Sequence, residues 1–127
     1  MKIQLTVALA LFIGAGLGAV AVQGLHAQAK PPAYVIAEID VANQDGYMKE
    51  YIPAGQKAVV DGGGKYLARG TKTAAFKGEP PKRIVLFVFE NFDKAQAAFT
   101  SPAFVEAAKI GEKYAKFRIF AVEGVAQ

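Results

Sequence analysis

The chain is 127 residues long and carries 15 lysines and arginines against 11 aspartates and glutamates, which gives a formal net charge of +4. Its longest basic run is Lys82-Arg83 and both signs of charge are interspersed, so the composition does not favour a nucleic-acid partner. No cysteine is present, which excludes disulfides and thiolate-ligated metals and leaves packing, within the chain or against a partner subunit, to stabilise the fold.

Residues 1–29 have the pattern of an export signal. Lys2 gives a positive start, residues 5–22 are apolar except for Thr6, and the run ends in the small-x-small pattern Ala27-Gln28-Ala29 that signal peptidase accepts. We expect cleavage after Ala29, a mature domain of residues 30–127, and a periplasmic or secreted location. The alternative is an uncleaved membrane anchor, because the apolar run is near the lower length limit for spanning a bilayer.

The first half of the mature domain contains a predicted strand and a predicted helix. Apolar residues alternate along residues 33–41, as in a strand with one buried face. Asn43 is a suitable cap for a helix over residues 44–61, in which Pro53 is expected to produce a kink. Gly62-Gly63-Gly64 ends that helix.

Two further strands are predicted in the middle of the chain. Residues 65–69 form a short strand, and a turn-rich segment over residues 70–81 follows it. The strongest strand is residues 83–89, because residues 84–89 are apolar at every position. Such a run indicates burial on both faces of the sheet.

The last part of the chain predicts a second helical region and a fourth strand. Asn91 can cap a helix that runs to about Thr100, and Ser101-Pro102 supplies a cap and a first-turn proline for its continuation. Residues 116–122 then alternate as a strand.

The order of these elements is strand, helix, strand, strand, helix, strand, the βαββαβ pattern of an α+β, ferredoxin-like domain. Both helices are then expected on one face of a four-stranded antiparallel sheet. Since residues 83–89 are apolar on both sides and no other segment remains, we expect a second copy to cover the other face. The prediction is a homodimer of the dimeric α+β barrel type.

Five short motifs, in this order and spacing, resemble a bacterial family of unknown function, the DUF1330 family. They are Ala33-Tyr34-Val35-Ile36, Gly63-Gly64-Lys65-Tyr66-Leu67-Ala68-Arg69-Gly70, Lys77-Gly78-Glu79-Pro80-Pro81, Ser101-Pro102-Ala103-Phe104 and Val122-Glu123-Gly124. The resemblance implies the dimeric α+β barrel fold and brings no established reaction. Its wider superfamily includes cofactor-free monooxygenases, isomerases and haem enzymes, so fold alone does not define function.

Several catalytic chemistries are excluded for the mature domain. The single histidine, His26, lies in the export signal, and the single serine, Ser101, is a helix cap. Ser-His-Asp and Cys-His catalysis are therefore excluded, as are metals or haem held by histidine. We expect no cofactor and no metal, and we identify no catalytic residue.

The remaining candidates for a site are tyrosines, one arginine and carboxylates. Tyr47 and Tyr51 lie one helical turn apart and Arg69 ends the second strand, so these three, with Glu38 or Glu90, can hold a small anionic or phenolic ligand. In the alternative interpretation the tyrosines pack in the core with their hydroxyls at its edge, and Arg69 pairs with a carboxylate.

Two functions follow from these candidates. One is a homodimeric module for small-molecule binding or assembly. The other is a cofactor-independent oxygenase or isomerase for an aromatic or enolisable substrate. In that enzyme Tyr47 or a carboxylate is the base and Arg69 stabilises the enolate.

Overall fold

A computed structural model of the protein describes residues 30–126, so the expected export signal lies outside the described residues. The elements are β1 (Ala33–Val41), α2 (Gln44–Gly46), the π-helical turn η1 (Tyr47–Tyr51), α3 (Ile52–Asp61), β2 (Lys65–Gly70), β3 (Arg83–Phe89), α4 (Phe92–Thr100), α5 (Pro102–Gly111) and β4 (Ala115–Glu123). Within residues 30–126, no helix is long and apolar enough to cross a membrane.

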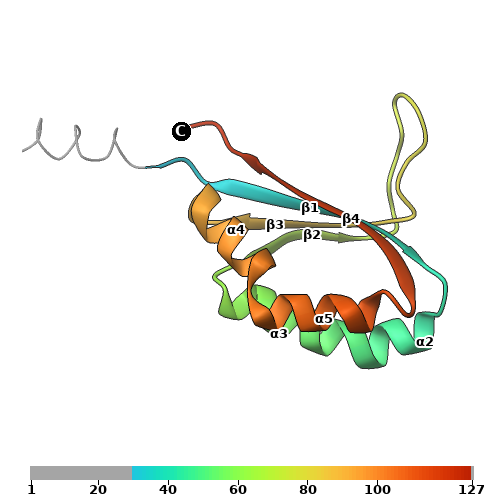
Figure 1. Ribbon diagram of the computed structural model, residues 1–127. Coiled ribbons are helices and arrows are strands. Elements are labelled where there is room, and N and C mark those ends of the chain that lie inside the picture. Colours follow the sequence, from blue (N-terminus) through green and yellow to red (C-terminus); the bar gives the residue numbers. More distant parts are fainter. Residues whose placement is uncertain (1–29, 127) are drawn as a thin grey trace, which may run out of the picture. The chain divides into compact units, whose positions relative to one another are not determined.

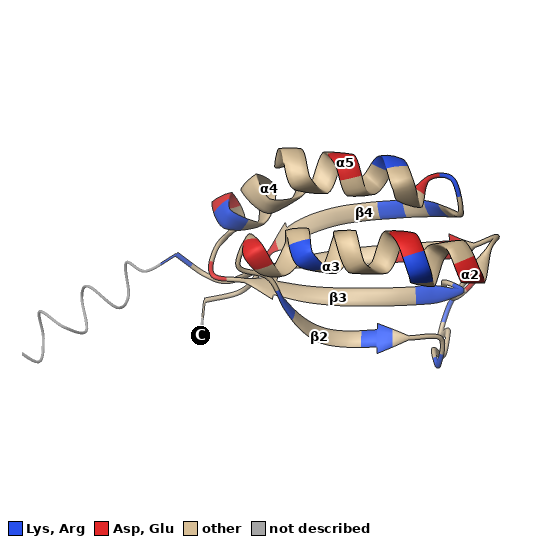
Figure 2. Cartoon of the chain, turned by 90° about the horizontal axis from the view of Figure 1, so that it is seen from below, with Lys and Arg blue, Asp and Glu red and all other residues tan. Residues whose placement is uncertain are grey.

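The four strands form one antiparallel sheet in the order β2-β3-β1-β4. Helices α3 and α5 lie side by side over one face of this sheet, and the loop between β2 and β3 projects from the other side (Figures 1 and 2). The predicted α+β, ferredoxin-like βαββαβ fold with a four-stranded antiparallel sheet is confirmed.

Each predicted helix start is capped as expected. The Asn43 side chain accepts a hydrogen bond from the Gly46 amide at 3.0 Å, and the Asn91 side chain accepts one from the Lys94 amide at 2.9 Å. The Ser101 hydroxyl accepts from the Phe104 amide at 3.2 Å, so its role as a cap is confirmed. These bonds satisfy amides that have no partner within the helix.

The first helix differs from its prediction in how it accommodates Pro53. Instead of a kinked α-helix over residues 44–61, the chain forms α2, the π-helical turn and α3. The Ile52 amide donates to the Tyr47 carbonyl, five residues back, and Pro53 then lies in the first turn of α3. Proline has no amide to donate, and the wider π-helical turn lies just before Pro53, where the hydrogen-bond pattern of the helix shifts.

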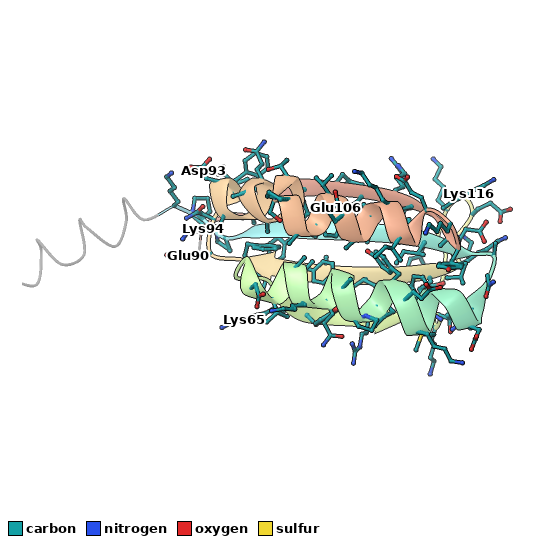
Figure 3. All side chains as sticks on the ribbon, turned by 60° about the horizontal axis from the view of Figure 1, so that its bottom comes forward. Lys65, Glu90, Asp93, Lys94, Glu106 and Lys116 are labelled. Atoms are coloured by element: carbon teal, nitrogen blue, oxygen red, sulfur yellow. The ribbon has the colours of Figure 1, made fainter. Side chains whose placement is uncertain are left out.

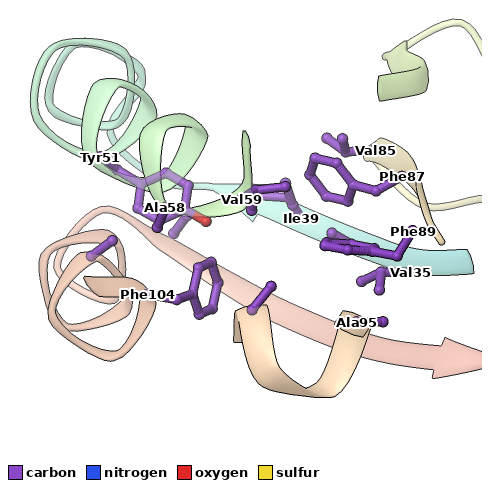
Figure 4. Packing of buried hydrophobic residues seen from close by; sticks show 14 of the residues in the cluster. Val35, Ile39, Tyr51, Ala58, Val59, Val85, Phe87, Phe89, Ala95 and Phe104 are labelled. Carbon is purple, nitrogen blue, oxygen red and sulfur yellow. The ribbon is translucent and has the colours of Figure 1, made fainter. Parts of the chain in front are cut away.

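The core lies between the sheet and the helices. Alternate residues of β1 and β3 point into it and meet Tyr51, Ala58 and Phe104 from the helix layer (Figure 4). Among the described residues, the largest fully buried side chains are Tyr47, Phe89 and Val35.

The opposite face of the sheet is also apolar, and we call it the open face. Phe120 and Val122 of β4 are 40% and 51% exposed there. No segment within residues 30–126 packs over it. The ion pair between Glu38 and Arg118 lies on the same side of the sheet. The apolar residues of the open face are Tyr34, Ile36, Ile84, Leu86, Val88, Phe120 and Val122.

Candidate functional site

A cavity of about 360 Å³ lies between the helix layer and the sheet. Its volume is within the range of roughly 300–1,000 Å³ that is typical of small-molecule sites. The walls are mainly aliphatic and aromatic, and among the described residues no carboxylate lines them. The polar or charged side chains of the lining are Tyr47, Tyr51, Gln56, Tyr66, Arg69 and Arg83.

The π-helical turn brings two tyrosines into this cavity. Tyr47 and Tyr51 are only 1% and 8% exposed, their rings stack at 5.4 Å, and the Tyr51 ring lies 4.9 Å from that of Phe117 on β4. Within residues 30–126, neither hydroxyl hydrogen-bonds to another group of the protein, yet neither is sealed from solvent. The hydroxyls of two nearly buried tyrosines therefore remain available to a ligand in the cavity.

Two glycines make room for the Tyr51 ring. A Cβ atom added at Gly55 of α3 would lie 2.9 Å from Tyr51 Cζ, and one at Gly111 of α5 would lie 2.6 Å from Tyr51 Cδ1. Such distances are too short for real carbon contacts. The two helices can therefore approach the ring this closely only because both positions lack a side chain.

Burial determines the protonation of the cavity tyrosines. It raises the pKa of Tyr47 and of Tyr51, with Arg83 partly offsetting the rise at Tyr47. Burial also raises the pKa of Tyr66, against the opposing effect of Arg69. All three phenols are consequently protonated hydrogen-bond donors at neutral pH, and none is a ready base.

Two arginines supply positive charge to the same cavity. The Arg69 guanidinium lies 4.9 Å from the centre of the Tyr66 ring, and that of Arg83 lies 5.6 Å from the centre of the Tyr47 ring. These are cation–π distances. Arg69 is solvent-exposed on the edge strand β2, and Arg83 is half-buried at the start of β3. None of the ion pairs between described residues involves either arginine.

A β-bulge in β2 turns Arg69 toward the cavity. Tyr66 pairs with Phe87 and Ala68 with Leu86, so Leu67 is the extra residue of the ladder. In a regular strand, side chains three positions apart point to opposite faces. The bulge shifts this alternation by one, so Tyr66 and Arg69 both face the helix layer.

The two candidate glutamates lie elsewhere. Glu38 of β1 is on the other side of the sheet, where it accepts a hydrogen bond from Arg118 at 3.0 Å. Glu90 is exposed just after β3, at the end of the domain where Asp93 and Lys94 also lie (Figure 3). The cavity therefore combines Tyr47, Tyr51 and Arg69, without either glutamate.

Three polar residues of the cavity lining, Gln56, Tyr66 and Arg83, were not among the sequence candidates. Arg83 has a sequence signal, because it alternates in phase with Val85 and Phe87, whose side chains are buried under the helices. Tyr66 has no such sequence signal, because only the bulge at Leu67 places it on the same face of β2 as Arg69. In the alternative interpretation the tyrosines pack in the core, and the structure does place Tyr47 and Tyr51 there. An ion pair between Arg69 and a carboxylate, its other part, is not observed within the described residues.

The cavity lining offers no metal ligands of the usual kinds. Among residues 30–126, no group of three histidine, cysteine, aspartate or glutamate side chains is arranged to hold a metal ion. What the lining offers instead is two guanidinium groups and three phenolic hydroxyls above aromatic walls. This donor set suits an organic anion with an apolar body.

Comparison with known proteins identifies the family. The family model "Domain of unknown function (DUF1330)" matches residues 32–125. The chain belongs to the DUF1330 family. This confirms the family expected from the sequence motifs and places the whole cavity within the DUF1330 match.

Solved structures similar to this DUF1330 domain share its fold at low sequence identity. One is a protein of unknown function from Rhodopseudomonas palustris, with a TM-score of 0.61 and 12% identity over 83% of this chain and 92% of that one. Another is SnoaB, a cofactor-independent oxygenase from Streptomyces nogalater, with a TM-score of 0.53 and 11% identity over 78% of this chain and 97% of that one. No curated protein matches the chain.

Proposed function

We propose that this domain is an exported, homodimeric module that binds a small molecule in the cavity between its helices and its sheet. The observation that carries the proposal is the pair of nearly buried side chains Tyr47 and Tyr51, whose hydroxyls have no protein partner in the described residues, in a cavity of ligand size. Both hydroxyls reach solvent within mainly apolar walls, so an acceptor of a ligand can replace the water there and form a hydrogen bond in surroundings of low polarity.

Binding is favoured over the alternative, a cofactor-independent oxygenase or isomerase. That alternative is supported by the fold shared with SnoaB, but such chemistry needs a base next to the substrate. No carboxylate of the described residues lines the cavity, and burial keeps its tyrosines protonated. The lining can therefore hold and orient a ligand, but it offers no group to remove a proton at neutral pH.

The test uses 2-naphthol, a neutral phenol with an apolar body, as the probe. Isothermal titration calorimetry should detect binding to the domain, and the variant Gln56→Trp should weaken it by at least about tenfold, because Gln56 is an exposed residue of the cavity lining. Val60→Trp, on the same helix and 49% exposed but outside the lining, is the control.

Two outcomes contradict this proposal. If Gln56→Trp and Val60→Trp bind 2-naphthol with equal affinity, the probe binds outside the cavity. Oxygen uptake with consumption of the probe would favour the oxygenase instead.

Export is a separate part of the proposal. N-terminal sequencing of the protein from the native envelope should give a mature chain that begins at Lys30. A chain that still begins at Met1 would contradict cleavage and favour the alternative, an uncleaved membrane anchor.

A further inference from the structure

Arg69 and Arg83 lie close together on adjacent strands. Arg69 is paired with Val85, and Arg83 precedes Val85 by two residues, so the arginines are diagonal neighbours on the same face. Diagonal neighbours in an antiparallel pair are roughly 7–8 Å apart, a separation that two long side chains can bridge. Both guanidinium groups therefore act on the same region of the cavity.

This pair of positive charges has no neutralising partner among the described residues. Within residues 30–126, neither arginine is in an ion pair and no carboxylate lines the cavity. An anion bound between two guanidinium groups is attracted by both of them. Guanidinium groups also match the geometry of a carboxylate, because each can donate two parallel hydrogen bonds.

The walls away from the arginines are aromatic. Tyr47 and Tyr51 stack on one side, and Phe99 and Phe104 lie 4.6 Å apart between their ring centres on the other helices. Flat rings pack well against such walls through offset and edge-to-face contacts. The Tyr51 hydroxyl, set among these rings, can donate to an oxygen of the ligand.

We infer that the cavity takes a planar aromatic acid, with its carboxylate between Arg69 and Arg83 and its ring among the tyrosines and phenylalanines. Arg69 is exposed, so the acid group lies at the rim and the ring enters first. This inference rests on the proposed function, because it names the class of the small molecule and its orientation in the same cavity.

The experiment compares 2-naphthoate with its neutral analogue 2-naphthamide by isothermal titration calorimetry at neutral pH. The acid should bind at least about tenfold more tightly than the amide, as expected when charge-assisted hydrogen bonds are added. Arg69→Met and Arg83→Met should each remove most of that preference, because each weakens binding of the acid much more than binding of the amide.

Lys94→Met is the matched control. It removes one positive charge from an exposed helical position at the end of the domain near Glu90 (Figure 3) and should leave the affinity for 2-naphthoate unchanged. An equal loss in Lys94→Met would attribute the preference to net charge and overturn the inference. If Arg83→Met does not fold, Arg69→Met decides the question, because Arg69 is exposed on an edge strand.

The remaining outcomes separate this inference from the proposed function. Equal binding of acid and amide, both weakened by Gln56→Trp, would overturn the aromatic-acid assignment and leave the cavity as a binding site. Failure of 2-naphthol, the acid and the amide all to bind would overturn both proposals.

Discussion

Tyr51 shows at the scale of one residue how the core and the candidate site depend on each other. Its ring packs against Phe117 and over two glycines, whereas its hydroxyl faces the cavity. A substitution that moves the Tyr51 ring would therefore also move the Tyr51 hydroxyl, which is the hydrogen-bond donor in the cavity. The cavity at this point is therefore shaped by the absence of side chains at Gly55 and Gly111.

Gly111→Ala tests this dependence. The added Cβ would meet Tyr51 Cδ1 at 2.6 Å and Phe117 Cε2 at 3.0 Å. Overpacking of this kind costs about 1–3 kcal/mol, more than the roughly 1 kcal/mol that alanine gains over glycine in a helix. Urea denaturation should show a lower free energy of unfolding. Glu106→Ala on the exposed side of the same helix should change it by less than about 0.5 kcal/mol, and a stabilised Gly111→Ala would contradict the packing argument.

The raised pKa of Tyr51 predicts how stability depends on pH. Below the ordinary value of 10.0, Tyr51 is protonated in both the folded and the unfolded chain and contributes no pH dependence. Above it the unfolded chain loses the proton first, so the free energy of unfolding falls by about 1.4 kcal/mol per pH unit for this group until the folded form also ionises. Urea denaturation between about pH 9 and about pH 11 should therefore show a steeper fall for wild type than for Tyr51→Phe. Parallel curves would contradict a buried, neutral Tyr51.

At the scale of the element, the bulge in β2 determines which side chains reach the cavity. Leu67 is the extra residue, so deleting it restores a regular ladder in which Arg69 still pairs with Val85. Inserting an alanine between Ala68 and Arg69 instead moves Arg69 by one position and turns it to the open face.

We expect the Leu67 deletion to retain the preference for 2-naphthoate over 2-naphthamide within about threefold and the alanine insertion to lose it. Calorimetry on both variants measures this preference, and circular dichroism verifies that each one folds. Retention of the preference in the insertion variant would show that the orientation of Arg69 does not depend on the register of β2.

The sequence predicts most elements, because their signals are local. Strict alternation defines β1, and side-chain caps at Asn91 and Ser101 define the starts of α4 and α5. The bulge at Leu67 has no such signal, since the ladder with β3 creates it. The π-helical turn is similar, because Pro53 indicates an irregularity without specifying its form.

The candidate site is also predictable only where its signals are local. Tyr47 and Tyr51 follow from helical spacing, which holds through the π-helical turn closely enough to keep both rings toward the sheet. Glu38 was a candidate carboxylate for the site, yet the alternation of the first strand alone assigns it to the face opposite Val35 and Ile39. Arg69 and Arg83 lie close together because β2 pairs with β3 in one particular register. The residue spacing within either strand does not predict that register.

At the scale of the whole molecule, the sheet has two apolar faces and the described residues cover one of them. Phe120 and Val122 are exposed on this face beside partly buried apolar residues, and burying such side chains against a partner would be favourable. A second copy that presents the same face would bury both surfaces around a two-fold axis. This supports the homodimer within the proposed function.

Phe120→Lys tests that homodimer. Phe120 is 40% exposed on the open face, and Val105, which is 43% exposed on helix α5, offers a control of nearly equal exposure on the other side of the sheet. In sedimentation at micromolar concentration, the mature domain should have about twice the monomer mass. Phe120→Lys should shift it toward the monomer, because a buried and unpaired lysine opposes association. Val105→Lys should remain dimeric. A mature wild-type domain that sediments as a folded monomer would overturn the dimer, as would dissociation caused equally by both lysines.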